Sequence, residues 1–290
     1  MTLLDNNWKP LSNILNFALD KSHIMEKLNI DEILVLKWKA VPVSQIAKMG
    51  LAEFDKMYDQ DRDEVERLID KANSIFDRQQ ALGIMTLSVQ DENYPIRLKE
   101  IGNEAPSLIH CLGNVDLLKE EKAISVIGAR AAGKEGLDAA YNLGKKYAEA
   151  GFVIVSGLAL GCDKAAHEGC LNAGGKTIAI VGSGLDIIHP IENSDLQRRI
   201  LEAGGLILSE QLLKQKASPR TLVARNRLQA ALSLSVILAE CPIKSGSMYT
   251  MNFARGYNKK CYAVIFTKRT ETNAGNFYLI DNNLAEPLTL

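Results

Sequence analysis

The feature that most constrains the fold of this chain is the alternation, from Ala123 onward, of short apolar runs with glycine-rich turns and helical stretches. The apolar runs predict strands at residues 123–127, 152–155, 177–181, 206–208, 236–239 and 261–265. The stretches between them predict helices at residues 135–150, 164–173, 195–203, 222–233 and 248–257. Near-continuous apolar strands that alternate with helices are typical of a parallel sheet covered on both faces. We therefore predict an α/β fold with a doubly wound, mostly parallel sheet, and ligands beyond the carboxyl ends of its strands.

A different pattern precedes Ala123. Apolar residues at helical spacing, together with a charged helix-favouring stretch, predict a small helical N-terminal domain over residues 1–84. The segments with this spacing are residues 11–19, 30–36 and 53–80.

The segment between the helices and the main sheet is punctuated by prolines. Residues 85–89 alternate between apolar and polar and predict one short strand. Pro95 and Pro106 then favour extended backbone, so residues 85–122 are predicted to be a linker that leads into the main domain, residues 123–290.

Composition is that of an ordinary globular protein, with 47% hydrophobic and 24% charged residues. No apolar run approaches the roughly 18 residues of a membrane span, and the N-terminus lacks a signal-peptide pattern, so we expect a cytoplasmic protein without membrane contact. Its five cysteines are scattered without C-x-x-C pairs or histidines at ligand spacing. We expect reduced thiols, no metal site and no cofactor.

Charge is distributed unevenly along the chain. Residues 211–269 contain eleven Lys or Arg and one acid, Glu240, whereas the whole chain has a formal net charge of −1. Clustered cations of this kind favour a polyanionic ligand, because they repel one another otherwise. The alternative is that they are spread over several solvated helix faces.

Loops at the predicted strand ends carry groups that suit phosphate binding. Glycines let backbone N–H groups approach an anion, and a cation or hydroxyl completes each loop. The residues are Gly128 and Arg130 after the first strand, Gly182, Ser183 and Gly184 after the third, and Lys244, Ser245, Gly246 and Ser247 after the fifth. Together these loops predict one anion-binding crevice. The alternative for each is a simple turn with solvated side chains.

Asp163 and His167 follow the second predicted strand, four residues apart on one helix face. Such a pair is compatible with acid–base chemistry, but neither Ser156 nor Cys162 is placed by sequence logic as its nucleophile. We favour a structural role, in which Asp163 caps the helix and His167 ties down the preceding loop. No catalytic residue is predicted.

The order of these motifs resembles the DNA-processing protein A family (DprA, also called Smf). The matching motifs run from Tyr94-Pro95 to Val264, and are Ala105-Pro106, Leu112-Gly113-Asn114, Gly128-Ala129-Arg130, Val155 to Asp163 with Ala166-His167, Gly182 to Asp186 with Pro190 and Asn193, Ser209-Glu210, Arg225-Asn226-Arg227, Glu240 and Ser245-Gly246-Ser247. So many motifs in the family's order are far more specific than any single glycine loop.

The resemblance implies an extended Rossmann-like fold with a positively charged pocket that binds single-stranded DNA. It also implies a homodimer that delivers single strands to a RecA-type recombinase during natural transformation, without enzymatic activity. Arg130 looks like the family's pocket arginine, and Arg225 and Arg227 look like its Arg-Asn-Arg motif. The anion-binding loops would be shaped by Gly157, Gly161, Gly182, Gly184, Ser245 and Gly246.

The chain departs from the family pattern at several positions. Cys162 stands where isoleucine is usual, and the segment before Arg225 lacks the usual Phe-Pro. The chain ends at Leu290, soon after the last predicted strand, so we expect a divergent member without the C-terminal winged-helix domain.

Two other functions remain open from the residues. One is a nucleotide-binding sensor or nucleotide-processing enzyme on the related Rossmann-like fold, although the Pro-Gly-Gly-x-Gly-Thr loop of nucleotide-cleaving relatives does not occur. The other is a purely structural interaction protein that docks through its N-terminal helices. The latter leaves the glycine loops without a purpose.

Overall fold

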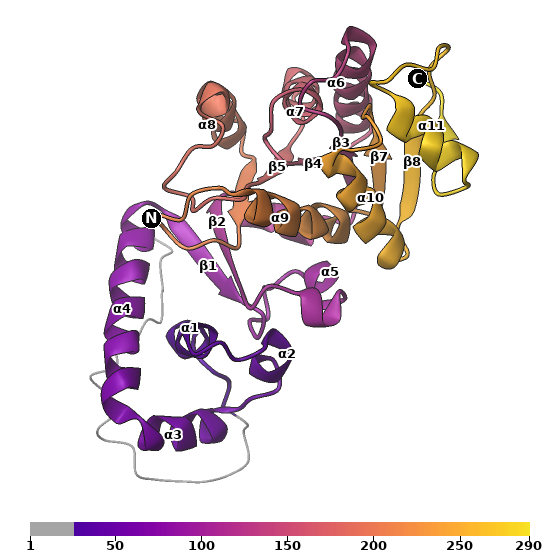
Figure 1. The fold of residues 1–290 in the computed structure, drawn as a ribbon. Helices are drawn as coiled ribbons and strands as arrows, with labels where there is room; N and C mark the ends of the chain where they lie inside the picture. Colours follow the sequence, from indigo (N-terminus) through magenta and orange to yellow (C-terminus); the bar gives the residue numbers. More distant parts are fainter. Residues whose placement is uncertain (1–25) are drawn as a thin grey trace.

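Residues 26–290, which the computed structural model describes, contain a nine-stranded sheet in the order β1-β2-β6-β5-β4-β3-β7-β8-β9 (Figure 1). The strands are β1 (Ile84–Ser88), β2 (Leu108–Gly113), β3 (Ala123–Ile127), β4 (Val153–Ser156), β5 (Thr177–Ile180), β6 (Leu206–Ser209), β7 (Ser235–Leu238), β8 (Lys260–Val264) and β9 (Glu286–Leu288). Neighbouring strands from β6 to β9 in this order are parallel. The predicted α/β fold with a doubly wound, mostly parallel sheet is thus confirmed, and its six predicted strands are β3 to β8.

Helices cover both faces of this sheet. They are α1 (Ile30–Trp38), α2 (Val43–Ile46), α3 (Leu51–Gln60), α4 (Arg62–Ala81), α5 (Ile96–Lys99), α6 (Lys134–Glu149), α7 (Cys162–Asn172), α8 (Ser194–Glu202), α9 (Pro219–Leu232), α10 (Gly246–Gly256) and α11 (Ala274–Asp281). Alternate residues of β3 show the two faces: Ile124 and Val126 pack with α6 and α7, whereas Ile127 packs with α10. Such two-sided burial explains the continuous apolar runs.

Helix α9 begins three residues before the predicted position, at Pro219 rather than residue 222. Ser218 is its N-cap and accepts a hydrogen bond from the Thr221 backbone N–H at 3.2 Å. Proline suits the first helical position because its missing N–H would have no partner there. This start places Arg225 and Arg227 within the helix.

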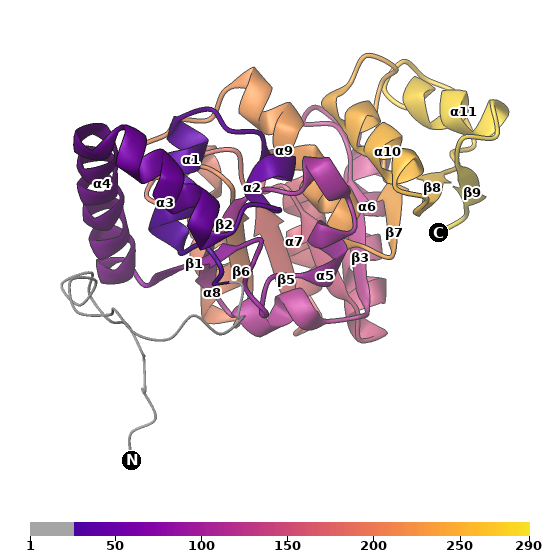
Figure 2. The same ribbon diagram turned by 90° about the horizontal axis from the view of Figure 1, so that it is seen from below.

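The short strand predicted at residues 85–89 is present as β1, but the segment after it, predicted as an extended linker, contributes a second strand to the sheet. β2 lies between β1 and β6 and pairs antiparallel with both. Leu108 of β2 belongs to the apolar core of α1 to α4, and Figure 2 shows these helices beside the β1–β2 edge. Pro95 and Pro106 favoured the prediction of a linker, but the loop between them is anchored to the fold. The Tyr94 hydroxyl donates a hydrogen bond to the Pro106 carbonyl at 2.7 Å, just before β2 begins.

Other expectations have mixed outcomes. The predicted helix at residues 11–19 lies outside the described residues. All five cysteines are free and buried. Within residues 26–290, no helix combines the length and apolar character needed to cross a bilayer.

Candidate functional site

Three loops meet beyond the carboxyl ends of β3, β4 and β7. The Ala129 N–H donates to the Glu240 carbonyl at 2.7 Å, and the Cys162 N–H donates to the Ala129 carbonyl at 3.1 Å. The Ser247 hydroxyl donates to the Gly128 carbonyl at 2.8 Å. These bonds join positions far apart in the sequence, so the sheet edge assembles the loops into one surface, which we call the loop crevice (residues 128–133, 156–161 and 240–247).

Glycine is required where these loops touch. A Cβ on Gly128 would overlap the Cys162 side chain. Gly161 has φ of +77°, a left-handed conformation, and a Cβ there would overlap the Ala129 carbonyl oxygen. The glycines therefore serve first to bring backbone against backbone.

Glu240, the single acid of the cationic stretch, holds the crevice together. Its side chain is 3% exposed. One carboxylate oxygen accepts from the Gly133 N–H at 2.5 Å, and the other accepts from the Thr272 hydroxyl at 2.9 Å. Sequence reasoning did not assign this role, although the isolation of one acid among eleven cations was the available signal.

Arg225 lies beneath the loop crevice rather than at its surface. It is 4% exposed, and its Nη2 is 3.8 Å from an Asp163 carboxylate oxygen. A Cβ on Gly157 would overlap the Arg225 guanidinium, so the loop rests directly on this side chain. With the Gln229 amide oxygen turned toward its donors, it accepts from Arg225 Nη1 at 2.6 Å and from the Gly157 N–H at 2.9 Å. Desolvation, opposed by the Arg225 charge, raises the pKa of Asp163.

Arg227 faces away from Arg225, because residues two positions apart in a helix point in directions about 200° apart around its axis. Its Nη1 donates to Glu210 at 3.0 Å and to the Ala224 carbonyl at 2.7 Å, and its Nε donates to the Glu104 carbonyl at 2.8 Å. The structure therefore does not bring Arg227 to the loop crevice. Of the predicted Arg-Asn-Arg motif, the first arginine supports the crevice and the second binds Glu210.

Arg130 and Lys244 are the predicted cations at the surface of the loop crevice. Both side chains are exposed, and neither takes part in an ion pair within the part of the chain that the structure describes. Desolvation lowers the pKa of Arg225, the Asp163 carboxylate opposes that shift, and the nearby charge of Arg130 adds a smaller lowering effect. Arg130 and Arg225, which are far apart in the sequence, therefore lie close enough for their positive charges to interact.

The start of α10 completes this surface. Ser245 is the N-cap, and its hydroxyl accepts from the Ser247 N–H at 3.3 Å. Gly246 is exposed, and a Cβ added there would meet nothing within 4 Å. Open space at the positive end of the α10 dipole, on the same surface as two exposed cations, suits an anion.

The groups predicted to face a phosphate in the loop after β5 make their contacts within the protein. Ser183 is fully buried, and its hydroxyl donates to the Ile187 carbonyl at 3.0 Å. The Gly184 N–H donates to the Gln215 carbonyl at 2.8 Å, and Leu222 of α9 packs against Gly182. The predicted phosphate-facing groups of this loop are thus occupied by the protein itself.

His167 has the structural role that the sequence favoured. Its Nε2 accepts from the Leu158 N–H at 3.3 Å, and its Nδ1 donates to the Thr177 hydroxyl at 2.7 Å, because that hydroxyl itself donates to the Ile154 carbonyl. Desolvation, with a smaller contribution from Arg225, lowers the pKa of His167 to about 3. The helix cap was predicted wrongly: Gly161 is the N-cap, and Asp163 instead accepts from the Ala159 N–H at 3.4 Å.

Comparison with known proteins adds independent evidence. The family model for DNA recombination-mediator protein A matches residues 85–290. The chain is 32% identical to Protein Smf of Synechocystis over 87% of its own length and 62% of that protein. It is 40% identical to DNA processing protein DprA of Streptococcus pneumoniae over 62% of each chain. The chain therefore spans less than two thirds of the length of these two relatives.

Solved structures agree with this relationship. The crystal structure of DNA processing protein A from Streptococcus pneumoniae has a TM-score of 0.67 and 32% identity, with 90% of each chain covered. A structure of the Helicobacter pylori protein, described for its single-stranded DNA binding mode, has a TM-score of 0.64 and 31% identity. It covers 70% of this chain and 90% of the Helicobacter chain.

Proposed function

Because this chain belongs to the DNA recombination-mediator protein A family, we propose that it binds single-stranded DNA in the loop crevice and acts as a recombination mediator. The observation that carries the proposal is that the loops bearing the exposed Arg130 and Lys244 are hydrogen-bonded together at the start of α10, while the buried Arg225 packs against the third loop of the crevice. The description of the Helicobacter relative as a single-stranded DNA binder supports the choice of ligand.

The crevice suits backbone recognition better than base reading. Its cations and the α10 N-terminus can contact phosphates, which carry no sequence information. Tyr249 is 52% exposed on α10 and is the nearest aromatic residue for base stacking, a contact that tolerates any base. We therefore expect affinity for single strands with little sequence preference.

We infer that the protein acts by binding rather than by catalysis. Ser156 donates its hydroxyl to the Val126 carbonyl at 2.7 Å. Cys162 is fully buried, and desolvation raises the pKa of its thiol to about 12. Neither nucleophile is available to the Asp163 and His167 pair.

Delivery of the strand to a RecA-type recombinase and assembly as a homodimer are the finer parts of this proposal. Their support is membership of a family described as recombination mediators. The test measures the rate at which a RecA-type recombinase forms filaments on single strands that are already coated with a separate single-stranded DNA-binding protein. The rate is compared with and without this chain. An unchanged rate, despite tight DNA binding, would remove the mediator part and leave the binding part.

The test of DNA binding is Arg130→Ala. We expect weaker binding of an oligonucleotide of arbitrary sequence, and a slope of log affinity against log salt that is shallower by about 0.7, the value for one lost phosphate contact on a single strand. The control is Lys56→Gln, which removes an exposed lysine from α3. If both variants bind like the native chain in every salt concentration, the loop crevice is not the DNA site.

A further inference from the structure

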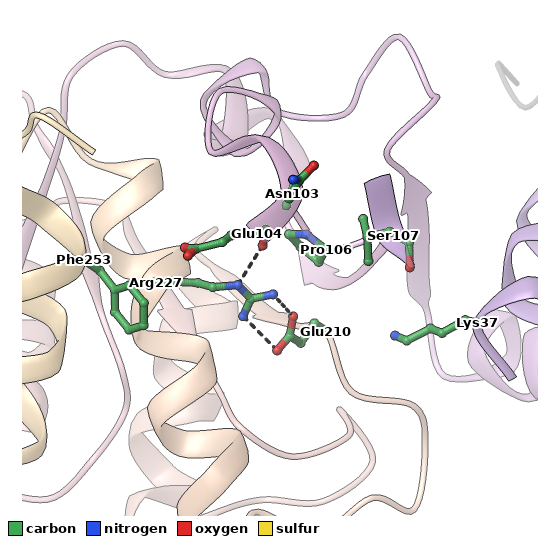
Figure 3. Close-up of a pocket in the computed structure, with 10 residues that line it drawn as sticks. Lys37, Asn103, Glu104, Pro106, Ser107, Glu210, Arg227 and Phe253 are labelled. Atoms are coloured by element: carbon green, nitrogen blue, oxygen red, sulfur yellow. Dashed lines mark hydrogen bonds and ion pairs between the residues drawn. The ribbon is translucent and has the colours of Figure 1, made fainter. Parts of the chain in front are cut away.

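A second cavity lies on the other side of α9 from the buried Arg225. Its volume is about 380 Å³, which is within the usual range for a small-molecule site. Residues from five parts of the chain line it, namely Lys37 of α1, Ser107 before β2, Glu210 after β6, Arg227 of α9 and Phe253 of α10. We call it the Lys37 pocket (Figure 3).

Two hydrogen-bond donors in the Lys37 pocket have no partner. Ser107 is 1% exposed, and its hydroxyl makes no hydrogen bond to any described residue. The Lys37 ammonium takes part in no ion pair or hydrogen bond within residues 26–290. A buried hydroxyl without a partner costs free energy that a ligand acceptor would recover.

Two of the other charged groups of the pocket are paired with each other. Arg227 and Glu210 form an ion pair whose side chains are 15% and 13% exposed. The exposed Glu104 carboxylate accepts a hydrogen bond from the Tyr257 hydroxyl, which leaves its charge in place. Lys37 is the cation of the pocket without an acidic partner among the described residues; it is exposed to water, and partial desolvation by neighbouring protein atoms lowers its pKa. A phosphate beside the ammonium would oppose that shift.

An aromatic face lies at the opposite end. Phe253 is half-buried and lines the pocket, and its ring stacks on Tyr257 with centroids 6.2 Å apart. Figure 3 shows Phe253 and Lys37 on opposite sides of the Arg227–Glu210 pair. The pocket thus offers a flat apolar face at one end and an anion-binding group at the other.

We propose that the Lys37 pocket binds one nucleotide unit, with its base against Phe253 and its phosphate against Lys37 and Ser107. The nucleotide is either free or part of a single strand that also occupies the loop crevice. Only the second source rests on the proposed function, because a free nucleotide would bind here whether or not the crevice holds DNA.

The experiment measures binding of deoxyadenosine monophosphate, inorganic phosphate and a short single-stranded oligonucleotide to the full chain by calorimetry. The variants are Lys37→Gln and Phe253→Leu, with Lys56→Gln as the matched surface control. Lys37→Gln removes one charged hydrogen bond, so we expect about tenfold weaker nucleotide binding. Phe253→Leu removes the stacking face, so we expect a loss of at least about fivefold.

Each outcome decides the proposal. Binding of the monophosphate that is weakened in Lys37→Gln and Phe253→Leu but kept in Arg130→Ala supports a free nucleotide. Oligonucleotide affinity that falls in both pocket variants, with no monophosphate binding, supports a nucleotide of the bound strand. Phosphate binding as tight as that of the monophosphate, or pocket variants that behave like Lys56→Gln with every ligand, overturns the inference. Failure of the loop crevice would show separately, as unchanged oligonucleotide affinity in Arg130→Ala.

Discussion

Contact between Gly157 and Arg225 determines how a charged side chain can lie under the loop crevice. The guanidinium occupies the space where a Cβ of residue 157 would be, so loop and arginine are packed without a gap. Arg225 then acts as a fixed positive charge within the protein, whereas Arg130 is exposed at the surface.

We predict that Gly157→Ala destabilises the fold by about 1–3 kcal/mol, because the new methyl group overlaps Arg225. The matched change is Gly246→Ala, where a Cβ meets nothing within 4 Å and unfolding free energy should change by less than about 1 kcal/mol. Urea denaturation of both variants measures the difference. Equal stabilities would show that the loop yields to the methyl group.

His167 should make stability depend on pH in a defined direction. Its pKa is about 3 in the folded protein, so the unfolded chain, with a histidine pKa near 6.5, takes up the proton first. This contribution to stability is complete above about pH 6.5 and is lost as the pH falls from there toward 3.

We predict that the difference in unfolding free energy between the native chain and His167→Gln becomes smaller as the pH falls. Below the histidine pKa of the unfolded chain, the slope of this difference against pH should approach about 1.4 kcal/mol per pH unit. Urea titrations at several pH values between 7.5 and 4.5 test this expectation. His189→Gln, which changes an exposed histidine, is the control and should keep the native pH profile. Parallel profiles for native and His167→Gln would contradict the assignment of a neutral, buried ring.

At the scale of elements, α9 connects two regions through its opposite sides. Arg225 supports the loop crevice, while Arg227 binds Glu210 after β6 and the Glu104 carbonyl. We predict that Arg227→Met costs about 2 kcal/mol, between the ranges for exposed and for buried ion pairs, because Glu210 loses its partner. The double variant Arg227→Met with Glu210→Gln should recover much of this loss, and a double-mutant cycle measures the coupling. Additive effects would show that the pair contributes nothing.

Strands β3 to β8 were predictable from the sequence because most of their residues are apolar and buried on both faces. This burial is complete in β3 to β6, whereas β7 and β8 each begin with a polar residue that is not buried. β2 was not, because it follows Pro106 and contains the buried His110, a polar residue in an otherwise apolar strand. In the structure, the His110 Nδ1 lies 2.9 Å from the side-chain amide of Gln79 in α4, a partner that the local sequence does not reveal, while its Nε2 has no hydrogen-bond partner among the described residues.

The candidate site was predictable in part for a similar reason. Loops at strand ends can be located from the strands, so Arg130 and Lys244 were found. The direction of a helical side chain depends on which face of α9 packs on the sheet, and this separated Arg225 from Arg227. The Lys37 pocket is lined by residues of five separate segments, and local sequence patterns contain no information on how such segments meet.

At the scale of the whole molecule, the N-terminal helices and the sheet share apolar core. Leu108 is fully buried among residues of α1 to α4, and Leu212 packs against the same cluster. We predict that Leu108→Ala costs about 2–5 kcal/mol and that the chain still unfolds in one transition. Both tryptophans, Trp8 and Trp38, lie in the N-terminal part, so their fluorescence reports on it, while circular dichroism reports on the whole. Two separated transitions would mean that the helices unfold independently.

The position of β2 between β1 and β6 also determines when β2 can form its native strand pairs during synthesis. Leu108–Gly113 leaves the ribosome roughly 100 residues before its partner Leu206–Ser209, which at about 5–20 residues per second is a delay of about 5–20 s. During that interval, one hydrogen-bonding edge of β2 has no native neighbour and is open to pairing with other chains. This edge of β2 is therefore one place where the nascent protein can aggregate until β6 has emerged.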